Sequence, residues 1–215
     1  MIFENREQAA RLLARRLSVY YRNKNPLVLG IPRGAIPMAK IIADVLGGQL
    51  DVVLVHKLGH PLQPELAIGA IDENGIFFLA EHAEEIEAEY IEAEKKRQVE
   101  TLRRRRTEYT PYRPPIDPHE RVVIVVDDGI ATGSTMTAAL RAVRAQKPKK
   151  LVAAVAVASP EAARAMLREA DAMVCLKVPV DFYAVGQFFV DFGQVRDEDV
   201  VAILQGGDLK ASATG

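Results

Sequence analysis

The sequence predicts an α/β fold of the doubly wound kind, in which helices cover both faces of a mainly parallel sheet. Helical and strand patterns alternate along its 215 residues, which is the order that parallel strands with crossover helices require. The run Val122–Val126 contains only β-branched residues, and such runs are typical of strands buried on both faces. No internal repeat is visible, and we expect one domain over residues 1–210 with a frayed tail at 211–215.

Local signals predict the individual elements. Asn5 is placed to cap a first helix, with Gln8 at the reciprocal position and apolar residues at helical spacing after it. The predicted strands are Leu27–Ile31, Leu50–Val55, a short Ile76–Leu79, Arg121–Val126, Leu151–Val157 and Ala172–Val178. The predicted helices that accompany them are Ile36–Leu46, which ends at two glycines, Ser134–Gln146, Pro160–Glu169 and Asp197–Leu204.

A long charged segment interrupts this alternation between residues 81 and 110. Acidic residues crowd its first half and basic residues its second half, which ends in Arg103–Arg106. Both charges oppose the helix macrodipole favourably, so we predict one long solvated helix inserted into the fold. The four arginines also suit a nucleic-acid surface, but no aromatic side chains are interleaved with them, which makes that alternative the weaker one. Prolines between 111 and 118 predict an extended connector back to the sheet.

Composition narrows the class of protein. A net charge of −1 argues against a dedicated nucleic-acid or membrane surface. The single cysteine, Cys175, excludes an internal disulfide framework and lies in an apolar run typical of a buried residue. No apolar stretch approaches membrane-spanning length, and the first residues lack the apolar core of a signal peptide. We therefore expect a cytoplasmic protein.

The most informative segment is Val122–Thr135. Its strand ends on the adjacent carboxylates Asp127 and Asp128, a turn of small residues follows, and a helix opens at Ser134. Ligands of open α/β sheets bind at the carboxyl ends of the strands, and the free N–H groups of a helix N-terminus suit a phosphate. The segment therefore predicts a phosphorylated sugar as ligand, although each feature taken alone is also an ordinary turn or helix cap.

This segment resembles the 5-phosphoribosyl-1-diphosphate (PRPP) motif of the type I phosphoribosyltransferases, and the chain is similar to a bacterial group of that family with no assigned acceptor. The resemblance implies that Asp127 and Asp128 bind the ribose hydroxyls and are catalytic. It implies that the 5′-phosphate is bound by Ala131, Thr132, Gly133, Ser134 and Thr135. Many members carry a larger aliphatic residue in place of Gly129, and we expect this departure to affect loop stiffness.

A second glycine-containing turn, Gly30–Pro37, follows the first predicted strand and also suits an anion. It matches neither the dinucleotide-binding nor the P-loop pattern. It resembles the pyrophosphate loop of the same family, which implies that Arg33 and Gly34 bind pyrophosphate, with Arg33 also catalytic. Family members often have a cis peptide here, and we expect one between Arg33 and Gly34. The alternative is a helix-capping turn with a surface arginine.

The second predicted strand leads into a histidine-containing segment. By resemblance, Lys57 lies near the pyrophosphate as a catalytic and binding residue, and the residues after it form a mobile loop that closes over the site and excludes water. Gly59 and Gly69 would act as its hinges and Glu65 as a hydrogen-bonding residue inside it. Two histidines, at positions 56 and 60, match no zinc signature, so contact with pyrophosphate is the preferred interpretation over a metal pair.

The aromatic segment 178–192 is similar to the hood of purine phosphoribosyltransferases, with the hood extending over about 178–210. The resemblance implies a base site of Val178, Phe182 and Tyr183, while Asp191 would reach the metal or the lid. The alternative makes the aromatic residues the core of a small cap. The family's aromatic-acidic step is replaced by Gln187, and Ser159 with its following proline stands where 6-oxopurine enzymes have a lysine, which argues against hypoxanthine or guanine.

Together these features predict a phosphoribosyltransferase that uses PRPP and Mg²⁺ and a small nitrogen heterocycle as acceptor. Mg²⁺ suits the oxygen donors of a diphosphate and one or two carboxylates. A second hypothesis is a PRPP- or nucleotide-binding regulatory protein without transfer activity, and a third, weaker one is a Mg²⁺-dependent phosphatase or phospho-acceptor domain. We expect no membrane partner and no nucleic acid. Because family members are commonly dimers, a homodimer is also expected.

Overall fold

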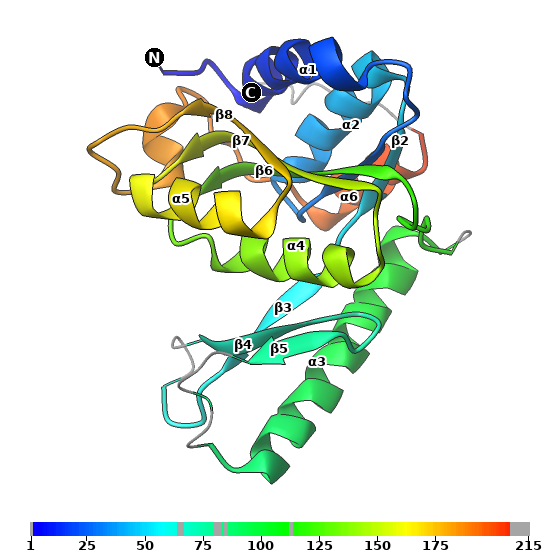
Figure 1. The fold of residues 1–215 in the computed structure, drawn as a ribbon, viewed down its shortest axis with the longest axis vertical. Coiled ribbons are helices and arrows are strands. Elements are labelled where there is room, and N and C mark those ends of the chain that lie inside the picture. The colour runs from blue at the N-terminus through cyan, green and yellow to red at the C-terminus, as the bar shows by residue number, and fades with distance from the viewer. Residues whose placement is uncertain (1, 64–66, 80–82, 84–85, 112–113, 207–215) are drawn as a thin grey trace.

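The computed structural model describes residues 2–63, 67–79, 83, 86–111 and 114–206. Five strands form a parallel sheet in the order β2-β1-β6-β7-β8 (Figure 1). Their bounds are β1 Leu27–Gly30, β2 Gln49–Val52, β6 Val122–Ile130, β7 Lys150–Ala158 and β8 Ala172–Lys177. The predicted doubly wound α/β fold is confirmed.

Helices cover both faces of this sheet (Figure 1). Helices α1 Arg6–Tyr21 and α2 Ala35–Leu46 pack on the face that contains Val28 and Ile124. Helices α4 Ser134–Ala145 and α5 Pro160–Glu169 pack on the opposite face, which contains Leu29 and Val125. Alternate residues of each strand thus enter opposite cores, which is why the strands are apolar without interruption.

The capping signals that predict the helix ends are confirmed. The Asn5 side chain accepts a hydrogen bond of 2.9 Å from the Gln8 amide and begins α1. Gly47 ends α2 with φ of 65°, a left-handed conformation that glycine adopts without steric cost. Ser159 caps α5 by accepting a hydrogen bond from the Ala162 amide. No helix in the part of the chain that the structure describes has both the length and the apolar character needed to cross a bilayer.

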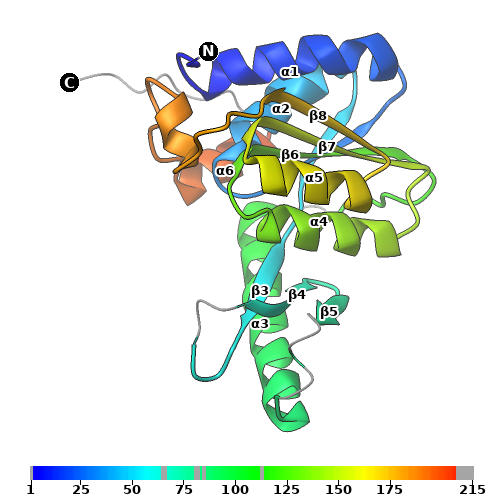
Figure 2. The ribbon, with the colours of Figure 1, turned by 60° about the vertical axis from the view of Figure 1, so that its left-hand side comes forward.

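A second body, which we call the arm, projects from the α4 side of the sheet (Figures 1 and 2). It consists of an antiparallel sheet in the order β3-β4-β5 and the long helix α3. The bounds are β3 Val55–Gly59, β4 Ala67–Asp72, β5 Phe77–Leu79 and α3 Ala88–Tyr109.

The arm corrects three sequence predictions. The strand expected at Leu50–Val55 is two strands, because β2 ends at Val52 and β3 begins in another sheet. The segment Ile76–Leu79 does not join the main sheet. Gly69 is not a loop hinge, because it lies in β4 beside the buried Ile68 and Ile71. The physical reason is the turn at Asp72, whose carboxylate accepts hydrogen bonds from the amides of Asn74 and Ile76 and folds β5 back on β4.

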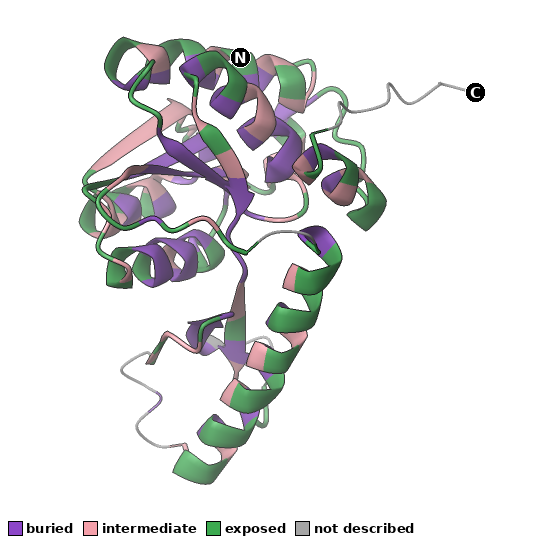
Figure 3. Cartoon of the chain, turned by 90° about the vertical axis from the view of Figure 1, so that its right-hand side faces the viewer, coloured by how far each residue is buried: buried purple, intermediate pink, exposed green. Residues whose placement is uncertain are grey.

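Helix α3 confirms the long charged helix, with a start at Ala88 rather than near residue 81. One side is buried and the other is exposed along its length (Figure 3). Arg106 belongs to the buried side: its Nη1 donates to Asp51 at 2.9 Å and its Nε to Glu73 at 2.7 Å. Arg103 also donates to the Glu73 carbonyl. Part of the four-arginine run therefore fastens the arm to β2 and is not available to a nucleic acid.

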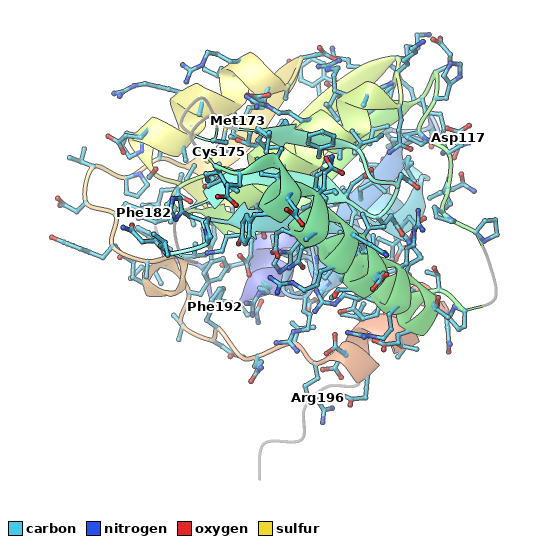
Figure 4. All side chains as sticks on the ribbon, turned by 90° about the horizontal axis from the view of Figure 1, so that it is seen from below. Asp117, Met173, Cys175, Phe182, Phe192 and Arg196 are labelled. Carbon is cyan, nitrogen blue, oxygen red and sulfur yellow. The ribbon has the colours of Figure 1, made fainter. Side chains whose placement is uncertain are left out.

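The C-terminal hood contains the 3-10 turn Val185–Phe188 and helix α6 Asp197–Leu204. It is stitched to the N-terminus, since the Phe3 amide donates to Phe188 and the Val190 amide donates to Phe3, both at 2.8 Å. The hood aromatics Phe182 and Phe192 lie on the side of the molecule opposite Asp117 of the proline-rich connector (Figure 4). The expectations for Glu65, the frayed tail at 211–215, the hood end at 207–210 and the helix start at 81–82 lie outside the described residues.

Candidate active site at the carboxyl end of the parallel sheet

The acidic pair lies where β6 loses one of its neighbours. Strand β1 ends at Gly30, which pairs with Val126, so Asp127 and Asp128 extend beyond it while β7 continues alongside. Strand β6 runs to Ile130, four residues further than predicted, because it keeps pairing with β7. The carboxylates therefore project at the carboxyl edge of the sheet, where ligands of this fold class bind.

The two carboxylates are electrostatically coupled. Burial raises the pKa of the Asp127 carboxyl well above its usual range, and the charge of Asp128 raises it further. Burial also raises the pKa of Asp128, against the charge of Arg6. The Arg6 Nε lies 2.9 Å from Asp128 Oδ2. Arg6 was not expected at the site, because nothing in the local pattern of the first helix distinguishes it from its neighbours.

The predicted phosphate loop lies at the N-terminus of α4. Gly133 has φ of 81° and precedes the helix. The Thr132 and Ser134 hydroxyls lie 3.2 Å apart, and the loop residues are exposed except for Gly133. The first amides of the helix have no partners within the helix itself, which makes this end suited to a phosphate. Ser159 supports the loop from below by donating 2.7 Å to the Ala131 carbonyl, a role that the sequence did not indicate.

Gly129 lies in β6 rather than in the loop, which corrects the expectation that it affects loop stiffness. A Cβ at this position would lie 2.6 Å from the side chains of both Val157 and Val185. Glycine is therefore required because the hood packs against the strand here.

The turn after β1 reaches the acidic pair. A Cβ at Gly34 would lie 2.5 Å from Asp128 Oδ2, so the structure brings these two predicted site residues into contact. The cis peptide lies between Pro32 and Arg33, one residue earlier than expected, because Gly34 already has helical backbone angles at the start of α2. Arg33 points to the hood, with its Nη1 3.1 Å from Asp197, which also accepts a hydrogen bond from Tyr109.

Lys57 lies in a different sheet from the acidic pair. It is exposed on β3 of the arm, opposite Ala70 of β4. The two histidines beside it bond within the chain: His56 Nδ1 is 2.7 Å from the Lys57 carbonyl, and His60 accepts from Leu62. No group of three or more potential metal-ligating side chains occurs among the described residues. The assignment of Lys57 to pyrophosphate stays a prediction.

The hood divides the predicted base residues between core and surface. Phe182 packs on Phe188 with ring centroids 5.4 Å apart, while Val178 and Tyr183 are exposed. Gln187 accepts from the amides of Tyr183 and Ala184, so this departure from the family pattern closes the hood turn. The Asp191 carboxylate accepts from the Gly193 amide.

Comparison with known proteins agrees with this geometry. A model of the phosphoribosyl transferase domain matches residues 1–192. In Mycobacterium tuberculosis, strains CDC 1551 and H37Rv each have a protein named as a candidate phosphoribosyl transferase, 40% identical over 206 residues. The match covers 94% of this chain but 46% of each relative, so the chain spans about half of their length.

The crystal structure of TT1426 from Thermus thermophilus is 45% identical to this chain. The two superpose with a TM-score of 0.87, over 97% of this chain and 100% of that one. The parallel sheet, the acidic pair at its carboxyl edge and the matched domain model lead to one conclusion: the chain belongs to the phosphoribosyl transferase family, with the type I fold.

Proposed function

We propose that this chain is a phosphoribosyltransferase, which transfers the 5-phosphoribosyl group of PRPP to a nitrogen heterocycle and releases pyrophosphate. The contact between Gly34 and Asp128 is the observation that carries the proposal. It brings the predicted pyrophosphate loop and the predicted ribose carboxylates together from two separate strand ends. The exposed loop at the start of α4 adds an anion site at the same edge of the sheet.

In this proposal the residues act by positioning and electrostatics. Asp127 and Asp128 accept hydrogen bonds from the ribose hydroxyls, and the amides of Ala131–Thr135 hold the 5′-phosphate. The Gly34 amide, Arg33 and Lys57 stabilise charge that grows on the departing pyrophosphate. No covalent enzyme intermediate is required, because orientation of PRPP and acceptor supplies much of the rate acceleration.

The donor set fits Mg²⁺. This ion takes oxygen ligands and keeps several waters, with one or two carboxylates from the protein. Asp191, on the hood beside the acidic pair's partner Arg6, is the carboxylate that the family resemblance assigns to it. When bound, Mg²⁺ neutralises charge on the diphosphate.

A PRPP-binding regulatory protein is the second candidate. The side chains of Ser159 and Gln187, at the two departures from the family pattern, are both engaged in internal hydrogen bonds. Neither is therefore placed to replace the family's contacts to a base. A site that binds PRPP without an acceptor would have this property.

Pyrophosphate release from PRPP distinguishes the two candidates. Release is measured with Mg²⁺ across purines, pyrimidines and other nitrogen heterocycles, with Asp128→Asn as the inactive control. Release that depends on one acceptor and is absent in the variant supports the transferase and identifies the acceptor. PRPP binding without release across the panel supports the regulatory protein.

A further inference from the structure

Arg6 connects three segments that are far apart in the sequence. It is the first residue of α1, and its Nε bonds Asp128 Oδ2 of β6 at 2.9 Å. Its Nη1 donates 2.6 Å to the carbonyl of Gly193 in the hood, and its guanidinium lies 3.8 Å from the centroid of the Phe192 ring. The side chain is only 14% exposed.

The guanidinium also borders the turn before α2. A Cβ at Gly34 would lie 3.2 Å from Arg6 Nη2 and 3.3 Å from Nε. Arg6 is therefore in the space between the acidic pair, the turn predicted to bind pyrophosphate and the hood. A purely structural link would not need a charge in this position, because burying an ion pair is costly and apolar residues pack as well.

The electrostatics give the charge a purpose. Adjacent buried carboxylates repel one another, and among the described residues Arg6 is the cation whose charge lowers the pKa of both. An ionised carboxylate only accepts hydrogen bonds, which is the property that sugar hydroxyls require of it. Arg6 engages one oxygen of Asp128 and so fixes the direction of the other.

We infer that Arg6 is a positioning residue of the ribose site: it orients the Asp128 carboxylate for the ribose hydroxyls and fastens the hood loop at Phe192 and Gly193 beside it. The inference rests on the proposed PRPP site and identifies a residue of α1 that completes it. Arg6 acts through Asp128 and contacts no pyrophosphate.

Ligand binding to three variants tests this role. Arg6→Gln removes the charge, Arg6→Lys keeps the charge but loses the forked geometry, and Arg11→Gln is the control. Arg11 lies on the same helix, is 60% exposed and pairs with Glu7 at the surface. Affinities for PRPP with Mg²⁺, for ribose 5-phosphate and for inorganic pyrophosphate are measured by calorimetry, with thermal unfolding of each protein alongside.

We expect Arg6→Gln to weaken binding of PRPP and ribose 5-phosphate about tenfold or more, and Arg6→Lys to recover part of that loss. Affinity for pyrophosphate is expected to stay within about twofold, as are all affinities of Arg11→Gln. Unchanged ribose 5-phosphate affinity in both Arg6 variants overturns the inference, as does a loss confined to pyrophosphate. If Arg6→Gln does not fold, Arg6→Lys alone decides, since wild-type affinity there overturns it. A wild-type protein that binds no PRPP refutes the proposed function itself.

Discussion

The parallel sheet and the arm solve the problem of attachment in opposite ways. The sheet is enclosed by two apolar layers, and strands β6 and β7 are buried over most of their length. The arm is joined to it by charged and polar groups, chiefly Arg106 with Asp51 and Glu73, and it leaves Phe77 and Leu79 partly exposed on β5. The apolar body positions the acidic pair, while the polar attachment sets where the arm lies.

The same difference reaches the predicted pyrophosphate loop. Tyr109, at the end of α3, donates to Asp197 of α6, and Asp197 also binds Arg33 of the loop. The arm thus contacts the candidate site through a chain of hydrogen bonds rather than through packing. Such polar links are directional, so a single substitution can break one without leaving a cavity.

The largest expected effect breaks the attachment of the arm. Arg106→Met leaves Asp51 and Glu73 buried without their shared guanidinium, so we expect a loss of about 3–5 kcal/mol in the free energy of unfolding. Urea unfolding measures it. Arg104→Met, on the exposed side of the same helix, is the control and should change stability by less than about 0.5 kcal/mol. Equal values for both variants would show that the ion network does not hold the arm.

The next effect separates function from the apolar body. Asp128→Asn keeps the size of the side chain but loses the ion pair with Arg6 and the negative charge for the ribose. We expect pyrophosphate release from PRPP to fall about 100-fold or more, which corresponds to about 2.7 kcal/mol. The midpoint of thermal unfolding should change by only a few degrees. Equal losses of activity and stability would make Asp128 a structural residue.

A smaller effect runs in the opposite direction. Asp127→Asn removes one of two adjacent carboxylates whose pKa is raised in the folded protein, so we expect the variant to be more stable by about 1 kcal/mol at pH 8. The folded state binds the proton more tightly than the unfolded state. Wild-type stability therefore falls as pH rises from the unfolded pKa towards the raised folded pKa, and the gain should vanish at low pH. Denaturant unfolding from pH 4 to 8 would expose a gain independent of pH, which contradicts this origin.

The smallest effect sharpens the link between the arm and the loop. Tyr109→Phe deletes the hydroxyl that donates to Asp197, for an expected loss of about 1 kcal/mol. Its hydrogen bond is the main cause that lowers the pKa of Asp197, with the Arg33 bond adding to it. A group with a lowered folded pKa stabilises the fold above its unfolded pKa and loses that contribution as pH falls. The difference between Tyr109→Phe and wild type should therefore shrink in acid, and chemical denaturation at pH 7 and pH 3 measures both values.

Predictions from sequence were most accurate for the sheet and its loops. The uninterrupted apolar strands, the Asn5 cap and the glycine end of α2 are local signals, and each lies where it was expected. The arm was predicted poorly, because a short strand such as Ile76–Leu79 carries no information about which sheet it joins. The turn at Asp72 decides that, through hydrogen bonds to amides that a residue pattern does not reveal.

By itself, the sequence determined the fold class, the acidic pair at a strand end and the family, because these depend on periodicity and on residues close together in the chain. Only the tertiary structure decided that Gly34 touches Asp128, that Arg106 is buried and that Arg6 belongs to the candidate site. The physical reason is the range of the interactions. A guanidinium on the first helix meets a carboxylate 122 residues away only after the sheet has brought them together.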